Sequence, residues 1–123
     1  MNSPEITELL AGVPDPTQEQ MMEMRKAAGS YTVVLLRKGP APRDDEARNT
    51  ELQFAHLQHL TKLTMLGKLA LNGPVLHDHD ILGISIYAAD LNEARALAEA
   101  DPKVQAGYLT VEAIPWMSVP GIR

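Results

Sequence analysis

The apolar positions of this chain follow two different spacings. The segment 31–38 (YTVVLLRK) is apolar at consecutive positions and rich in β-branched residues, which predicts a strand covered on both faces. From Leu52 to Leu66 leucines recur at helical spacing, which predicts an amphipathic helix that ends at Gly67. Similar patterns predict strands at 68–76 and 81–89, a second helix at 91–100 and a last strand at 108–117.

The order of these elements defines the expected fold. Asp90 is a capping residue followed three positions later by Glu93, so the second helix should begin there, and it should end before Pro102. The resulting order, β-α-β-β-α-β, is that of a ferredoxin-like α+β fold with an antiparallel sheet. We assign residues 30–118 to this domain and residues 119–123 to a tail.

Residues 1–29 precede the domain and differ from it in composition. Pro14 and Pro16 interrupt the segment, and 17–28 (TQEQMMEMRKAA) is rich in helix formers, with Thr17 as an N-cap. We therefore expect an N-terminal helical extension that the core of the domain does not require.

The two predicted helices cover only one face of the predicted sheet. The second face also carries large apolar groups, and the aromatic residues that we assign to it are Tyr31, Tyr87, Tyr108 and Trp116. An apolar face of this size is unusual on a monomer, and burial against a second copy is the simplest way to remove it from water. The pattern therefore predicts a homodimer that packs sheet on sheet.

Composition narrows the class of protein. The chain has 123 residues, a formal net charge of −5 and no cysteine. The acidic balance argues against nucleic-acid and anionic-membrane partners, and the lack of cysteine excludes disulfides and thiolate chemistry. No apolar run approaches the ~18 residues that span a bilayer, and the first residues lack the features of a secretory signal. We expect a cytoplasmic protein.

His56 is the first candidate for chemistry. It shares a helical face with Leu52, Leu60 and Leu63, so it should point toward the sheet. A histidine in that position is either a core residue bonded to a backbone carbonyl or a proton-transfer group. The pattern alone favours the core role and leaves both open.

Other polar residues are candidate metal ligands. His59 lies three residues after His56, and the segment 77–80 reads HDHD. Because neither has a defined metal-ligand spacing, we expect a solvated connection at His77 to Asp80 and no metal site.

Two loops and two cations bear on the cofactor and the substrate. The segments GPAP (39–42) and LNGP (71–74) lack the glycine pattern of phosphate-binding loops, so we expect no nucleotide cofactor. Arg37 and Lys38 end the first strand, where charges either meet an anionic substrate or, more usually, are solvated.

Two segments together resemble a known family. They are HLQHLTKLTMLGKLALNGPV (56–75) and GISIYAADLNEARALAEADPKVQAGYLTVEAIPW (83–116). They resemble the YCII-related (YciI-like) proteins, in register over about 31–117. The resemblance implies a ferredoxin-like fold that pairs as a dimeric α/β barrel.

The resemblance also implies a site. By position, the family's His–Asp pair corresponds to His56 and Asp101. This implies a small-molecule enzyme, a lyase, isomerase or hydrolase that uses acid–base chemistry without a cofactor. The alternative is a non-catalytic dimeric module that binds a metabolite or a protein. The substrate is not indicated.

Overall fold

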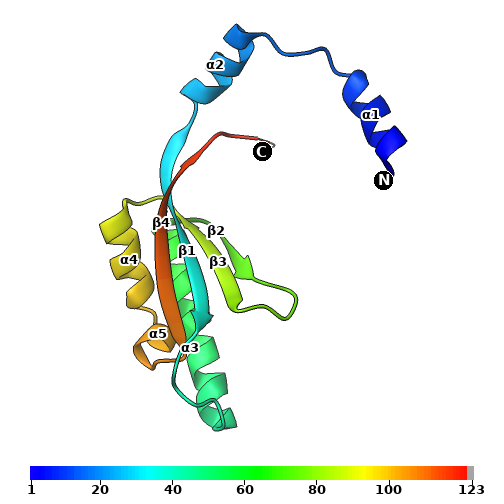
Figure 1. Cartoon of the computed structure of the whole chain (residues 1–123). Helices are drawn as coiled ribbons and strands as arrows, with labels where there is room; N and C mark the ends of the chain where they lie inside the picture. Colours follow the sequence, from blue (N-terminus) through cyan, green and yellow to red (C-terminus); the bar gives the residue numbers. More distant parts are fainter. Residues whose placement is uncertain (122–123) are drawn as a thin grey trace. The chain divides into compact units, whose positions relative to one another are not determined.

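The computed structural model describes residues 1–121 and contains a compact α+β unit over Gly29–Ser118 (Figure 1). Its elements are β1 (Gly29–Lys38), α3 (Glu46–Met65), β2 (Leu69–Pro74), β3 (Ile81–Tyr87), α4 (Leu91–Glu99), α5 (Pro102–Gln105) and β4 (Leu109–Ser118). The four strands form one sheet in the order β2-β3-β1-β4, and every neighbouring pair is antiparallel. This is the ferredoxin-like arrangement, so the predicted fold class is confirmed.

The core lies between one face of the sheet and the helices α3 and α4 (Figure 1). Alternation along the strands places every second residue on this face. The buried residues that form the core are Val34, Leu36, Leu63, Leu69, Tyr87, Ala94, Ala98 and Leu109. These positions include the helical and strand stripes that the sequence pattern predicts.

The positions of Tyr87 and Tyr108 correct the sequence-based assignment. Both were expected on the open face of the sheet, but they are 1% and 5% exposed and belong to the interior of the domain. Tyr87 pairs with Thr32, which is itself buried on the helix side of the sheet. Tyr108 comes just before β4, so the alternation of that strand does not extend to it. Trp116 does lie on the open face, where it is 46% exposed.

Helix ends follow local signals. The α3 helix ends at Met65 and Gly67 follows with a φ of 74°, a conformation that glycine adopts without steric cost, so the predicted end is confirmed. The Asp90 side chain accepts a hydrogen bond from the Glu93 amide at 2.8 Å and caps α4. After Asp101 the chain forms the one-turn helix α5, where the sequence pattern predicted only a turn.

Two helices precede the domain, α1 (Ser3–Ala11) and α2 (Gln18–Lys26). Thr17 caps α2 as predicted. The α1 helix was not predicted, because it is short and has no buried face, although Asn2 and Glu5 form a capping box at its start. Of the predicted tail, residues 119–121 have no regular structure, and 122–123 lie outside the described residues.

Within residues 1–121, none of the helices combines the length and the apolar character needed to cross a membrane.

Candidate active site

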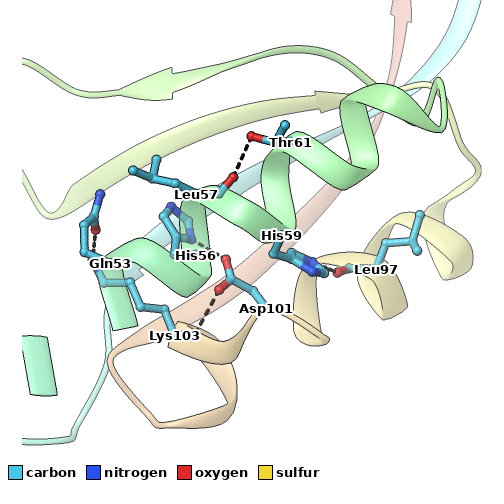
Figure 2. A network of polar contacts seen from close by, with 8 residues as sticks. All are labelled: Gln53, His56, Leu57, His59, Thr61, Leu97, Asp101 and Lys103. Atoms are coloured by element: carbon cyan, nitrogen blue, oxygen red, sulfur yellow. Dashed lines mark hydrogen bonds and ion pairs between the residues drawn. The ribbon is translucent and has the colours of Figure 1, made fainter. Parts of the chain in front are cut away.

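The two residues singled out by the resemblance are in direct contact. His56 lies on α3, and Asp101 lies between α4 and α5, 45 positions later in the chain. The ring nitrogen Nδ1 of His56 is hydrogen-bonded to Oδ2 of Asp101 (Figure 2). Their side chains are only 12% and 3% exposed, so the contact is shielded from water.

The second oxygen of Asp101 has a structural task. Oδ1 accepts a hydrogen bond from the backbone amide of Lys103 at 2.9 Å and caps α5. Pro102 occupies the first helical position, where a missing N–H costs nothing. A buried carboxylate is tolerated when its oxygens are hydrogen-bonded, and here each oxygen has a partner.

This arrangement selects one tautomer of His56. An ionised carboxylate only accepts hydrogen bonds, so Nδ1 must carry the proton that is shared with Asp101. The neutral ring then presents a lone pair on Nε2. Among residues 1–121, His56 makes no hydrogen bond through Nε2. The free nitrogen is therefore available to a ligand.

His56 also lines a cavity of about 250 Å³ between α3 and the β2–β3 side of the sheet. Its walls are partly apolar and partly polar. The lining residues are Leu36, Arg43, Gln53, His56, Leu57, Leu60, Asn72, Gly73, Pro74, Leu82, Gly83, Ser85, Lys103 and Leu109. The site thus combines a histidine of fixed tautomer with space for a small molecule beside it.

His59 has a different role from His56, although it lies one turn away on the same helix. Its Nε2 is 2.8 Å from the carbonyl oxygen of Leu97, to which it donates (Figure 2). This contact links α3 to α4 and is the core role that was considered for His56.

The histidines of the β2–β3 connection lie away from this pair. Residues 77–80 are exposed, and the Nδ1 of His79 accepts a hydrogen bond from the Ile81 amide at 2.9 Å. Across residues 1–121, His, Asp and Glu side chains form no group of three or more placed to hold a metal ion.

Comparison with protein families gives a match to the YCII-related domain over residues 31–117. The chain belongs to the YCII-related family. The match covers β2 and β3, nearly all of β1 and β4, the helix that carries His56, and Asp101. No curated protein matches the chain.

Solved structures resemble this YCII-related protein to different extents. One is 5-chloro-2-hydroxyhydroquinone dehydrochlorinase from Burkholderia phenoliruptrix, in complex with 2,5-dihydroxybenzoquinone. It is 22% identical, with a TM-score of 0.53 over 70% of this chain and 92% of that chain. A protein of unknown function from Rhodopseudomonas palustris is 20% identical, with a TM-score of 0.35 over 89% of this chain and 97% of that chain.

The cavity of this YCII-related protein holds two cations that the sequence analysis did not single out. Arg43 comes from the connection between β1 and α3, and Lys103 comes from α5. Neither segment has a periodic pattern that would direct attention to it. The cations that the sequence analysis did consider lie elsewhere: Arg37 forms ion pairs with Glu112 and with Asp80, outside the cavity.

Two pKa shifts occur around Asp101. Burial raises the pKa of Tyr87 to about 12, and the charge of Asp101 adds to this rise. Burial lowers the pKa of Lys103 from its usual value, and the nearby charge of Arg43 lowers it further, while Asp101 acts in the opposite direction. The environment therefore disfavours the ionised form of Tyr87 and the protonated form of Lys103.

Proposed function

We propose that this YCII-related protein is an enzyme that acts on a small molecule by general acid–base catalysis. His56 is the proton-transfer group, and Asp101 is the residue that positions it. The observation that supports the proposal is the hydrogen bond between Nδ1 and Oδ2, formed at the wall of a cavity. A base held in one tautomer beside a bound substrate contributes about 10²- to 10⁴-fold to a rate.

The proposed chemistry uses both nitrogens of the ring. Nε2 accepts a proton from the substrate, and the imidazolium that forms is stabilised by the adjacent Asp101 carboxylate. The same nitrogen then returns the proton to a leaving group or to another atom of the substrate. This sequence suits an elimination or an isomerisation, and with water as the proton donor it suits a hydrolysis. The dehydrochlorinase of the same fold is an example of elimination, although at 22% identity its substrate is not carried over.

The test compares variants that separate the two roles of Asp101. Asp101→Asn keeps a capping oxygen for the Lys103 amide but removes the charge beside His56. Asp101→Ala removes both. His56→Gln keeps an amide that can donate to Asp101 and removes the proton-transfer group. His59→Gln, which changes the neighbouring histidine bonded to Leu97, is the matched control.

We expect turnover to fall about 10²- to 10⁴-fold in His56→Gln and in Asp101→Asn. His59→Gln should keep the wild-type rate. The substrates to be screened are small hydroxylated or carbonyl-bearing ring compounds, including 5-chloro-2-hydroxyhydroquinone. A variant at His56 that turns over a substrate of the wild-type protein at an unchanged rate would refute the assignment.

A second measurement does not depend on knowing the substrate. Nitrogen-15 NMR of the imidazole at neutral pH should find the proton on Nδ1 and a lone pair on Nε2. In Asp101→Asn the amide can donate to Nδ1, so the populated tautomer should change. A wild-type ring protonated on Nε2 alone would leave no base facing the cavity, and a non-catalytic binding module would then be the better description.

We also propose that the protein is a homodimer. The strand register places Tyr31 opposite Trp116, and Val33 opposite both Ile86 and Ile114, on the sheet face that the helices do not cover. Trp116 and Ile114 are 46% and 40% exposed in the single chain. A contiguous apolar face of this kind is usually buried against a partner, and a second copy offers the same face.

A further inference from the structure

The cavity beside His56 contains two positive charges without a negative partner. Arg43 and Lys103 both line it. Within residues 1–121 neither side chain forms an ion pair, although Lys26, Arg37, Arg48 and Lys68 do. Other cations without an ion pair in this part of the chain are exposed, whereas Arg43 and Lys103 are half-buried. The exposed ones are Arg25, Lys38, Lys62 and Arg95.

The side-chain hydrogen bonds that hold the two cations go to neutral groups. The Nη2 of Arg43 donates to the backbone carbonyl of Tyr108, and its guanidinium carbon lies 5.3 Å from the centre of the Tyr108 ring. The Nε of Arg43 is buried without a hydrogen-bond partner in the described chain. The Nζ of Lys103 donates to the amide oxygen of Gln53 (Figure 2). Every partner is neutral, and the buried Nε donor is unused.

Placing two like charges at one cavity has an energetic cost. Burial lowers the pKa of the Lys103 ammonium, Arg43 lowers it further, and Asp101 offsets only part of this, so the free protein holds the two cations against mutual repulsion. An anion between the two cations would offset this repulsion. A concave site lined by charges of one sign also concentrates ligands of the opposite sign.

The rest of the cavity limits the size and the character of the ligand. Leu57, Leu60 and Leu82 provide apolar walls. A dry cavity of about 150 Å³ accommodates benzene, so 250 Å³ fits one ring with a few substituents. The planar guanidinium of arginine matches the geometry of a carboxylate, which it binds through two parallel hydrogen bonds.

We propose that Arg43 and Lys103 form an anion-binding subsite and that the ligand of this cavity is a single-ring compound with a carboxylate group. The carboxylate lies between the two cations, and the ring lies against the leucines and His56. The inference deepens the proposed function and relies on it only for the role of His56. In this arrangement the cations bind and orient the ligand, and the imidazole moves the proton.

The test uses benzoate as the probe and benzamide as its neutral counterpart, which has nearly the same shape. Binding is followed by amide chemical shifts in a titration at constant ionic strength. We expect benzoate to shift the resonances of residues around the cavity and to bind at least tenfold more tightly than benzamide. A charge-assisted hydrogen bond is worth a factor of about ten or more in affinity, which sets this expectation.

Variants locate the subsite. Arg43→Gln and Lys103→Gln should each weaken benzoate binding about tenfold or more and leave benzamide binding unchanged. Lys68→Gln is the matched control, because Lys68 pairs with Glu93 and does not line the cavity. Lys103→Gln should stay folded and so keeps the test valid if Arg43→Gln unfolds. Within residues 1–121 the Lys103 ammonium makes one side-chain hydrogen bond, to Gln53.

The outcomes separate this inference from the proposed function. Benzoate should still bind to His56→Gln within about threefold, because the cations are intact. Equal binding of benzoate and benzamide, or binding that neither cation variant weakens, would overturn the subsite whatever the tautomer of His56 proves to be. Benzoate binding that depends on both cations, together with a ring protonated on Nε2, would keep the subsite and reject the catalytic role.

Discussion

At the scale of single residues, Asp101 shows how one side chain serves the fold and the site together. An aspartate before a proline is common at turns, and on its own this position would be a helix cap. Capping uses only Oδ1, however, and Oδ2 remains for His56. The capping contact therefore fixes the carboxylate in the place where it also meets His56.

Tyr87 gives a test of how strongly this region disfavours additional negative charge. Burial and the charge of Asp101 raise its pKa from 10.0 to about 12. Between these pH values the unfolded chain loses the phenol proton and the folded chain keeps it, so stability should fall as pH rises from 10 to 12. The loss is on the order of 2 kcal/mol. Urea unfolding at a series of pH values measures it.

The variants for this measurement are Tyr87→Phe and Tyr31→Phe. Tyr87→Phe cannot ionise, so its stability should fall less steeply over the same interval. Tyr31→Phe removes a phenol from the opposite face of the sheet and is the control for the loss of a hydroxyl away from Asp101. If the Tyr87→Phe curve runs parallel to wild type above pH 10, the environment of Tyr87 is not the one described here.

At the scale of elements, the connection after β1 determines where Arg43 lies. Gly39 donates its amide to the Tyr108 carbonyl at 2.8 Å, and Ala41 donates to the Gly107 carbonyl at 3.0 Å. These two bonds attach the connection to the turn between α5 and β4. As a result, Arg43 and Lys103, which are 60 positions apart, reach the same cavity.

Gly39 is the position at which this attachment can be broken. A Cβ added there would lie 2.1 Å from the Gly107 carbonyl oxygen, so the backbone of one segment would have to move. We expect Gly39→Ala to destabilise the domain by about 2 kcal/mol or more and to weaken benzoate binding by displacing Arg43. Gly73→Ala is the control for stability, because a Cβ there meets nothing within 4 Å, and Lys68→Gln, which does not change a residue of the cavity, is the control for binding.

Denaturant unfolding and the benzoate titration provide the two readouts. Equal stabilities of the two alanine variants would mean that the connection adapts freely and does not position Arg43.

The sequence predicts the helices and strands that have a buried face better than the short helices that have none. Strands and helices with buried stripes, such as β1 and α3, were predictable because burial imposes a period on their residues. The short helices α1 and α5 have no buried residue, so only their caps marked them. The error at Tyr87 arose because the assignment of strand faces needs the register between strands, which no single strand contains.

The site was predictable to a smaller extent. The family resemblance singled out His56 and Asp101, whose side chains meet in the structure, whereas helical periodicity alone favoured a core role for the histidine. The cations were not predictable, because Arg43 lies in an irregular connection and Lys103 in a single helical turn. Their proximity depends on the contact between Gly39 and the turn at Gly107, which joins segments far apart in sequence.

At the scale of the whole molecule, the open sheet face and the cavity lie on opposite sides of the sheet. The cavity is lined by residues of the helix side, such as Leu36 and Ser85, and by α3. The open face carries Val33, Ile84 and Ile114. Along each strand, residues of the open face alternate with residues of the helix side. One chain therefore provides the whole cavity wall described here, and pairing through the open face should not be needed for binding.

This separation leads to a prediction about assembly. Ile114→Glu places a charge in the middle of the apolar face, and a buried charge without a partner is strongly unfavourable, so the dimer should dissociate to a folded monomer. Leu76→Glu is the matched control, since Leu76 is 93% exposed in the β2–β3 connection. Sedimentation velocity should give a dimer for wild type and for Leu76→Glu. The Ile114→Glu monomer should bind benzoate as the dimer does. A wild-type monomer would disprove the pairing, and a monomeric variant that folds but no longer binds benzoate would mean that the partner completes the site.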